Sequence, residues 1–421
     1  MNHSESNDRY KWFVLGMLTI VYTFNFIDRQ ILVILSEPLK ADLGLSDAQL
    51  GMLTGLAFAA LYVTLGIPIA RWADMRNRKN VVAVSLAFWS FMTAISGKVM
   101  NFSQLFLARI GVGVGEAGGS PPAHSIISDY FPPEKRATAL SIYSTGIYLG
   151  ILLGYVVGGI IAENYGWRMA FYAIGIPGVI FAAILYYTVK EPIKGQNDPT
   201  GVVEDNPSLK EVMRILWTKK TFWFLAISSG FHTFGTYGVG NFLPPFFQRV
   251  HDIDIATVGI ALGLATGIGG GLGTYLGGFL SDRLQSRDKR WYIWIPILAG
   301  LVNMVPNVVL FFSNDAQLAL ASTFLTSSLT AFYLGPTIAV THSLVNARMR
   351  AFASAILFFI LNLIGLGLGP LTIGAVSDLL APEYGELSLR WAFCVTFVTG
   401  GISLLFAWLG SRTYLNDLES E

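Results

Sequence analysis

The sequence predicts an all-α membrane protein with twelve transmembrane helices. Of its 421 residues, 53% are hydrophobic and 13% are charged, whereas a soluble domain carries about 25% charged residues. Apolar stretches of about 20 residues, the length that crosses a bilayer, follow one another along the chain. The single cysteine excludes a disulfide framework, and the net charge of +1 favours no nucleic-acid partner.

Hydropathy and charge place the twelve spans. The first is too long for a removable signal peptide and lacks a small-residue cleavage site, so we expect it to remain as a membrane helix. The expected spans are 12–35, 48–70, 81–97, 103–126, 137–162, 168–188, 221–247, 256–281, 291–312, 315–345, 351–380 and 390–412.

The distribution of positive charge predicts the orientation. Most of the 28 lysine and arginine residues lie in the terminal segments and in the links that follow even-numbered spans. Because positively charged links stay on the cytoplasmic side, both termini are expected in the cytoplasm, with the chain crossing the cell (inner) membrane many times.

The sequence also contains an internal repeat. GWRMAF (166–171) returns as LRWAF (389–393), and KRATA (135–139) returns as MRAFA (349–353), in the same order. We therefore expect an N-terminal six-helix bundle (1–188), a cytoplasmic linker (189–220) and a C-terminal six-helix bundle (221–421), with a central cavity between halves that can rock. SLKEVMRILW in the linker is typical of an amphipathic surface helix.

Four charged residues stand inside apolar spans: Asp28, Arg29, Arg109 and Glu116. A charge near the bilayer centre costs about 3 kcal/mol or more unless it faces protein or water. Arg109 and Glu116 are about two turns apart on one helix and project from nearly the same face. Asp28 and Arg29 are neighbours, so they cannot share one partner equally.

We interpret these four residues as a site for protons and substrate. Burial disfavours a charged carboxyl group and a nearby arginine favours it, so an acid that gains and loses its arginine can take up and release protons. A freed guanidinium suits a phosphate or carboxylate group. The alternative is a structural ion pair that links helices one and four.

The glycine-rich stretch GVGVGEAGG (111–119) has the spacing of a dinucleotide-binding turn, but no strand precedes it. We expect these glycines to allow close helix contact around Glu116. In the next span, glycines at every fourth position form a smooth stripe: Gly146, Gly150, Gly154 and Gly158. No cofactor is predicted, since the sequence has no phosphate loop and no metal-ligand spacing.

Two loops carry a family resemblance. ARWADMRNRK (70–79) and GFLSDR (278–283) resemble the two copies of the loop after the second and eighth helices of the major facilitator superfamily; the first copy departs from the pattern at Ala70, Met75 and Asn77. FNFIDRQ (24–30) and the segment 107–141 are similar to the Spinster-like branch, which implies Asp28, Arg29, Arg109 and Glu116 in the transport path. Organic anion symporters of the superfamily carry a similar Asp-Arg pair.

The resemblance implies a role for further residues. Aromatic and histidine side chains on helices one, five, seven and eleven are candidates for lining the cavity: Phe24, Phe26, Tyr143, Tyr148, Phe231, His232, Phe234, Tyr237 and Phe358. His232 can equally be a satisfied interior histidine. The expected cytoplasmic gate comprises Asp74, Arg78, Arg136, Asp282 and Arg350; the alternative for Asp74 is a solvated loop charge.

The function expected from these features is secondary active transport by alternating access. The Spinster-like branch implies a lysolipid-like, amphipathic anion as the substrate, and the four intramembrane charges add proton coupling. The superfamily fold implies a monomer in contact with membrane lipids. A proton-coupled symporter of a small organic anion, such as a sugar acid, is the alternative. An intramembrane enzyme or lipid receptor would need a catalytic pair or a metal cluster, and the sequence shows neither.

Overall fold

In a computed structural model, residues 3–59, 64, 68, 69, 75–195, 209–346 and 348–419 are described, and none of these residues lies in a strand. Every predicted span coincides with helical elements, although the second, 48–70, is described only in part. Within these described ranges, eight helical stretches are long and apolar enough to cross a membrane by length and composition, and one of them extends over 69 residues. The prediction of an all-α membrane protein is confirmed.

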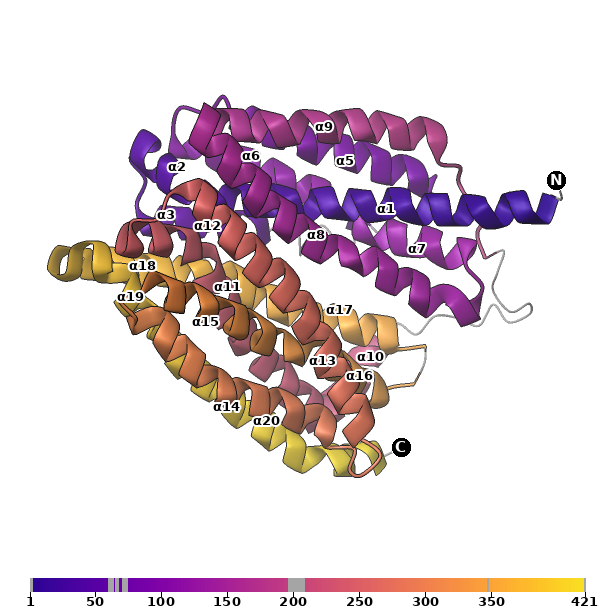
Figure 1. The fold of residues 1–421 in the computed structure, drawn as a ribbon. Coiled ribbons are helices and arrows are strands. Elements are labelled where there is room, and N and C mark those ends of the chain that lie inside the picture. The colour runs from indigo at the N-terminus through magenta and orange to yellow at the C-terminus, as the bar shows by residue number, and fades with distance from the viewer. Residues whose placement is uncertain are drawn as a thin grey trace. The chain divides into compact units, whose positions relative to one another are not determined.

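The first compact unit comprises the described residues of Met1–Leu45, Ala57–Val202 and Asp254–Gly263. Its long helices run side by side (Figure 1). Its elements are α1 (His3–Ile34), α2 (Ser36–Leu43), α5 (Arg78–Ser96), α6 (Phe102–Glu116), α7 (Ser120–Tyr130), α8 (Pro133–Tyr165), α9 (Trp167–Thr188) and α12 (Ile255–Leu262).

The second unit comprises the described residues of Ser46–Leu56, Val203–Ile253 and Leu264–Glu421. Its elements are α3 (Asp47–Gly51), η1 (Met52–Leu56), α10 (Leu209–Thr218), α11 (Lys220–His251), η2 (Gly263–Ile268, which begins on the last residue of the first unit), α13 (Gly269–Leu284), α14 (Trp291–Phe312), α15 (Ala316–Thr330), η3 (Ala331–Tyr333), α16 (Leu334–Ser343), α17 (Arg350–Leu361), η4 (Asn362–Leu368), α18 (Gly369–Tyr384), η5 (Gly385–Leu387), α19 (Ser388–Ala392) and α20 (Val395–Glu419).

The predicted glycine stripe on α8 is where α1 packs against it. A Cβ atom on Gly146 would lie 2.8 Å from the carbonyl oxygen of Thr19, and one on Gly150 would lie 2.6 Å from that of Thr23. These spacings are shorter than van der Waals contact, so the backbones of α1 and α8 approach closely only because these positions carry no side chain.

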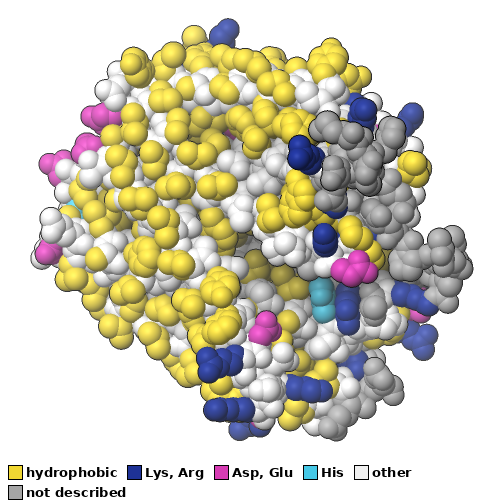
Figure 2. Space-filling view, turned by 45° about the vertical axis from the view of Figure 1, so that its right-hand side comes forward, with side chains coloured by type: hydrophobic (Ala, Val, Ile, Leu, Met, Phe, Trp, Pro, Cys, Tyr) yellow, Lys and Arg dark blue, Asp and Glu magenta, His cyan; other side chains and the backbone are white. Residues whose placement is uncertain are grey.

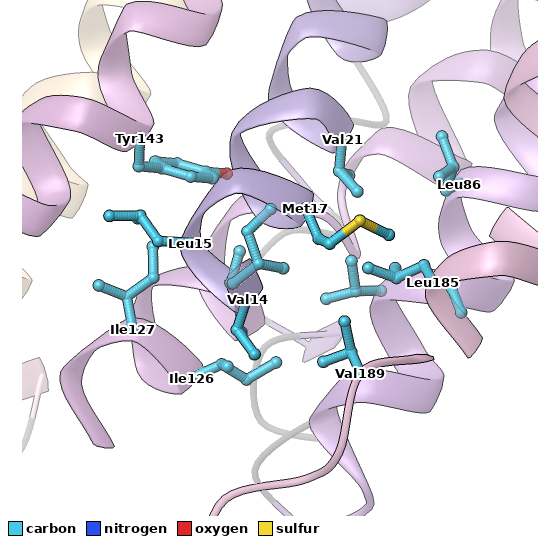
Figure 3. Close-up of a cluster of buried hydrophobic side chains, with 14 of the residues drawn as sticks. Val14, Leu15, Met17, Val21, Leu86, Ile126, Ile127, Tyr143, Leu185 and Val189 are labelled. Carbon is cyan, nitrogen blue, oxygen red and sulfur yellow. The ribbon is translucent and has the colours of Figure 1, made fainter. Parts of the chain in front are cut away.

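The part of α1 that precedes this contact in sequence lies in a compact apolar core of the first unit. Figure 3 shows Val14, Leu15 and Met17 of α1 among side chains from other helices, including Leu86 and Leu185. All five are nearly or completely inaccessible. This core fixes α1 relative to α5 and α9, and therefore fixes the polar residues farther along α1.

In the second unit, α11 and α20 are joined by reciprocal hydrogen bonds. The hydroxyl of Ser228 donates to the carbonyl of Ser403, and the hydroxyl of Ser403 donates to the carbonyl of Ser228, each at 2.8 Å. The linker segment predicted to be amphipathic forms α10. Val212 and Leu216 of α10 are completely buried in the core of this unit, whereas Trp217 is exposed.

A buried polar network holds α3 within the second unit. Two guanidinium nitrogens of Arg249 donate to the two carboxylate oxygens of Asp47, each at 2.7 Å, and the hydroxyl of Ser377 donates to the same carboxylate. The carboxylate of Asp378 accepts from the backbone amides of Asp47 and Ala48 at the start of α3. A carboxylate in that position is favoured by the helix dipole.

Glycines again permit the approach of backbones around this network. A Cβ on Gly51 would lie 2.2 Å from the carbonyl oxygen of Pro370, and one on Gly374 would lie 2.1 Å from that of Asp47. Neither glycine can be replaced without moving a helix. Residues 46–56, expected in the N-terminal bundle, thus pack with the second unit, while the predicted division at residues 189–220 remains a prediction.

The surface agrees with a lipid environment. Figure 2 shows a face covered mainly by hydrophobic side chains, with most of the visible lysine and arginine side chains along the right-hand and lower sides of the view. Large apolar side chains such as Leu107, Ile180 and Val305 are more than half exposed. A water-soluble protein rarely exposes apolar area on this scale, so these side chains are suited to contact lipid.

We predict that Arg249→Met destabilises the protein by about 3 kcal/mol, because the substitution leaves the buried Asp47 carboxylate without its cation. The free energy of unfolding is measured by denaturant titration in detergent micelles. The control is Arg168→Met, whose partner Asp42 is half exposed and which is expected to cost less than about 1 kcal/mol. Equal effects of the two substitutions would contradict a structural role of the Asp47 network.

Candidate functional site

The four intramembrane charges predicted from the sequence lie together in the first unit. Asp28 and Arg29 are on α1, and Arg109 and Glu116 are on α6. Asp28 is 0% exposed, Glu116 is 1% and Arg109 is 2%. Two carboxylates and two guanidinium groups balance in charge, which makes their common burial tolerable.

Arg29 and Glu116 form a direct ion pair. The Nε and Nη2 atoms of Arg29 each lie 2.8 Å from Oε2 of Glu116. The guanidinium also lies over the rings of Phe26 and Phe58, at 5.0 and 4.4 Å from their centroids. The apolar rings and the carboxylate thus hold Arg29 from different sides.

Asp28 and Arg109, unlike Arg29 and Glu116, do not form an ion pair between their side chains. The Nη1 atom of Arg109 donates to the backbone carbonyl of Asp28 at 3.1 Å, not to its carboxylate. Among the described residues, neither carboxylate oxygen of Asp28 has a hydrogen-bond partner, and neither does Nε of Arg109. Oε1 of Glu116 likewise has no hydrogen-bond partner among the described residues. The site therefore contains one direct ion pair, through Oε2 of Glu116, beside an acid and a base that are close but not joined through their side chains.

Polar side chains of α5 complete the cluster, and sequence reasoning missed them. Trp89, Ser90 and Thr93 are all 0% exposed. Trp89 and Thr93 lie one helical turn apart and are close enough to Asp28 to interact with its carboxylate. Asn25 of α1 is similarly close to Glu116. Uncharged side chains within an apolar span give no charge signal, so only their tertiary position identifies them.

The glycine-rich stretch of α6 packs against these side chains. A Cβ on Gly115 would lie 2.7 Å from Cβ of Trp89, and one on Gly119 would lie 3.3 Å from the Trp89 ring. A Cβ on Gly113 would lie 3.0 Å from the carbonyl oxygen of Phe58. These contacts agree with the prediction that the stretch serves close helix contact around Glu116.

The aromatic candidates of the first unit divide into packed and partly accessible side chains. Tyr143 is 1% exposed and stacks on Tyr22 with ring centroids 4.4 Å apart. Phe24 packs beside Phe181 and against the core. Phe26 lies next to Arg29, and Tyr148 is partly buried. Phe26 therefore directly contacts the guanidinium group of the charge cluster.

In the second unit, His232 is a satisfied interior side chain. Its Nε2 atom lies 2.9 Å from the carbonyl oxygen of Thr330, and its ring lies 4.2 Å from that of Tyr333. This hydrogen bond accounts for its presence in an apolar helix. The remaining candidates of this unit range from buried to exposed: Phe234 is buried, Phe231 and Tyr237 are partly buried, and Phe358 is exposed.

The residues predicted to form a cytoplasmic gate lie in different settings. Arg78 is buried and donates to Glu191, Asp129 and Ser125, so it ties the residues after α9 to α5 and α7. Arg136 donates to the carbonyls of Ser128 and Phe131.

The other gate candidates are less enclosed. Asp282 accepts a hydrogen bond from Tyr292 at 2.7 Å, and Arg350 is exposed at the start of α17. Asp74 lies outside the described residues. A gate formed by these residues remains a prediction.

Comparisons with known proteins agree with this architecture. The chain belongs to the Major Facilitator Superfamily, whose family model matches residues 18–306. It is 33% identical over 423 residues to an MFS-type efflux pump of Mycolicibacterium smegmatis, an alignment that covers 98% of this chain and 95% of that protein.

A solved structure is also closely similar. A bacterial homologue of the human lysosomal transporter Spinster, crystallised in an inward-facing and unoccupied conformation, superimposes with a TM-score of 0.89 at 33% identity, covering 97% of this chain and 98% of the other. The predicted resemblance to the Spinster-like branch is confirmed. A probable galactarate/D-glucarate transporter of Bacillus subtilis is 32% identical over 190 residues, covering 44% of this chain and 42% of that protein.

These relationships define the chain as a multi-pass membrane transporter and not an enzyme. Among the described residues, no cluster of three or more histidine, cysteine, aspartate or glutamate side chains could hold a metal ion. The charge cluster is the candidate site, because Asp28, Arg109 and Glu116 are buried together with Arg29 inside the first unit.

We predict that Gly115→Ala destabilises the protein by about 1–3 kcal/mol, because the added methyl group would overlap Trp89. Alanine is otherwise the better helix former by about 1 kcal/mol. The control is Gly240→Ala on α11, where a Cβ would meet nothing within 4 Å. Unfolding in micelles compares the two variants; a stabilised Gly115→Ala variant would contradict the packing role.

Proposed function

We propose that this protein is a secondary active transporter that moves an anionic, amphipathic, lysolipid-like substrate by alternating access, coupled to protons. The observation that carries the proposal is the buried charge cluster of α1 and α6. Among the described residues, the side chain of Arg109 is not joined to a carboxylate, and the carboxylate of the neighbouring Asp28 is not joined to a base.

In this proposal, the charge balance of the cluster couples proton binding to anion binding. The cluster is neutral when Asp28 and Glu116 are both ionised and Arg29 and Arg109 are both charged. Protonation of either acid leaves one positive charge in excess, and an anion restores neutrality. Binding of a proton and binding of an anion therefore favour each other, which is the reciprocity that coupled transport requires.

The groups around the cluster suit an amphiphile. Arg109 offers guanidinium nitrogens that can bind a phosphate or carboxylate group. Phe26 and Phe58 lie against Arg29 and provide an apolar surface directly beside the charges. The similarity to a solved homologue of the lysosomal transporter Spinster and to an efflux pump supports the transport function that this proposal requires.

A small organic anion, such as a sugar acid, is the second candidate. It is supported by the partial similarity to a probable galactarate/D-glucarate transporter. The same guanidinium chemistry binds a sugar-acid carboxylate, but such a ligand would need polar partners along its length where a lysolipid needs apolar ones.

We also propose how the protein lies in the membrane and which parts of it move. We infer that the protein works as a monomer in the cell (inner) membrane with both termini in the cytoplasm. The positive-inside charge distribution supports this orientation of the termini. Two six-helix halves, 1–188 and 221–421, rock about the cluster. Asp74, Arg78, Arg136, Asp282 and Arg350 close the cytoplasmic side.

A substrate screen separates the candidates. Purified protein in vesicles is tested for uptake of anionic lysophospholipids and of sugar acids, with and without an imposed pH gradient. The proposal expects gradient-stimulated transport of the lysophospholipids and competition between members of that class. Transport of sugar acids alone would favour the second candidate, and uptake indifferent to the pH gradient would contradict proton coupling.

We predict that Glu116→Gln abolishes gradient-dependent uptake, because a neutral amide cannot exchange a proton or form the ion pair with Arg29. The measurement is the difference in initial uptake rate with and without the pH gradient. Glu163→Gln, at an exposed position on α8, is the control and retains the wild-type difference. A wild-type response in Glu116→Gln would remove Glu116 from the coupling mechanism.

A further inference from the structure

We propose that the outward face of α10, in the second unit, is a binding surface for the headgroups of anionic phospholipids. This α10 surface consists of Lys210, Arg214 and Trp217. It lies on a different unit from the charge cluster of α1 and α6. The inference therefore goes beyond the proposed function and concerns the membrane around the protein, not the substrate.

The apolar face of α10 is covered by protein. Val212 and Leu216 lie one turn apart and are 0% exposed, and they belong to the same buried cluster as Leu357 of α17. The indole nitrogen of Trp223 on α11 donates to the carbonyl of Leu216 at 3.1 Å. An amphipathic surface helix normally inserts its apolar face into the bilayer. Because protein covers that face here, the opposite face is the one left for an outside partner.

The opposite face carries two cations and a tryptophan. Lys210 and Arg214 are four positions apart, and Arg214 and Trp217 are three apart, so the three side chains project from one side of the helix. All three are exposed, and Trp217 is 69% exposed. Glu211 is exposed as well, about 100° around the helix from Lys210. The two cations outnumber this one acid, so the α10 surface has an excess of positive charge.

Arginine–tryptophan pairs mark the level of the membrane surface in the second unit. The guanidinium of Arg412 lies 4.0 Å from the ring centroid of Trp408 on α20. The guanidinium of Arg290, just before α14, lies 4.8 Å from the ring centroid of Trp294. Tryptophan is enriched where a membrane protein passes from the hydrocarbon to the headgroups, so we assign the start of α14 and the end of α20 to this level.

Hydrogen bonds and packing place α10 beside the same helix ends. The Nζ atom of Lys219, between α10 and α11, donates to the backbone carbonyl of Asp417 on α20 at 2.7 Å. The amide of Thr221 on α11 donates to the carboxylate of Asp417 at 2.7 Å. Leu216 of α10 shares a buried cluster with Ile293 of α14. The α10 surface therefore lies at the depth of the lipid headgroups.

An anionic phospholipid matches the chemistry of the α10 surface. Arginine binds a phosphate through two N–H groups, and lysine attracts it as a point charge. The indole of Trp217 combines an apolar ring with a hydrogen-bond donor, which suits the boundary between acyl chains and headgroups. A zwitterionic headgroup also carries a cation, which Lys210 and Arg214 repel. We therefore expect selection of phosphatidylglycerol over phosphatidylcholine.

The test measures which lipid lies next to Trp217. The purified protein is placed in vesicles of phosphatidylcholine and phosphatidylglycerol, in which one lipid or the other carries bromine on its acyl chains. Bromine quenches nearby tryptophan fluorescence, and the quenching lost in Trp217→Phe belongs to Trp217. Each cation at a membrane surface favours an anionic lipid about fivefold. We expect the association ratio of phosphatidylglycerol to phosphatidylcholine at Trp217 to be at least about fivefold.

Charge variants separate the α10 surface from the net charge of the protein. The double variant Lys210→Gln with Arg214→Gln is expected to bring the ratio close to one. The matched control is Arg287→Gln with Lys289→Gln, which removes two exposed cations between α13 and α14 and is expected to leave the ratio at Trp217 unchanged. Raising the salt to about 1 M is expected to lower the wild-type ratio, because it screens exposed charges.

The possible results either support or overturn the inference. A wild-type ratio close to one overturns it, and so does a double variant that keeps the wild-type ratio. A control that lowers the ratio as much as the double variant overturns it as well. None of these results bears on the proposed function, because lipid contact at Trp217 is measured without transport. Conversely, a failure of gradient-dependent uptake leaves the lipid ratio at Trp217 unaffected.

Discussion

The enclosure of four charges between α1 and α6, three of them buried and that of Arg29 partly exposed, is the constraint on which the rest of the site depends. Isolated charges in an apolar interior cost several kcal/mol each, so the helices must bring opposite charges together or the fold fails. The structure meets this requirement unevenly. Arg29 and Glu116 are joined at 2.8 Å, whereas Arg109 reaches only the backbone carbonyl of Asp28. The direct ion pair stabilises the cluster, and we propose that Asp28 and Arg109, whose side chains are not joined, bind a proton and an anion.

Small residues make this arrangement possible. The glycines of α8 let α1 approach it, and those of α6 admit Trp89 and Phe58 beside the charges. Side chains at these positions would separate the helices and enlarge the distances between charged groups. Glycine placement and charge placement are thus two parts of one requirement, because electrostatic interactions in an apolar interior are strong only at short range.

Much of the fold could be predicted from the sequence, for an identifiable reason. Hydropathy and the positions of Lys and Arg mark membrane segments directly, and an intramembrane charge such as Glu116 stands out because its cost is high. The pairing of the charged side chains could not be predicted in this way. Whether Arg29 or Arg109 bonds Glu116 depends on rotation and depth of two helices, to within an ångström, and no sequence period fixes these.

Residues without a distinctive local signal were also missed. Trp89 and Thr93 look like ordinary members of an apolar span, and Asp47 and Arg249 lie where a span meets a loop, where charge is unremarkable. Their roles follow from distant contacts: Asp47 and Arg249 are far apart in sequence yet share two hydrogen bonds of 2.7 Å. The same contacts draw residues 46–56 into the second unit, contrary to the simple order of spans along the chain.

Proton exchange on ligand binding tests the central claim most directly. An anionic lysophospholipid is titrated into the purified protein in buffers of different ionisation enthalpy, and calorimetry gives the number of protons taken up per ligand bound. The account predicts net uptake in the wild type near the pH at which the acids titrate, and none in the double variant Asp28→Asn with Glu116→Gln. Binding without proton uptake in the wild type, or unchanged uptake in the double variant, would contradict it.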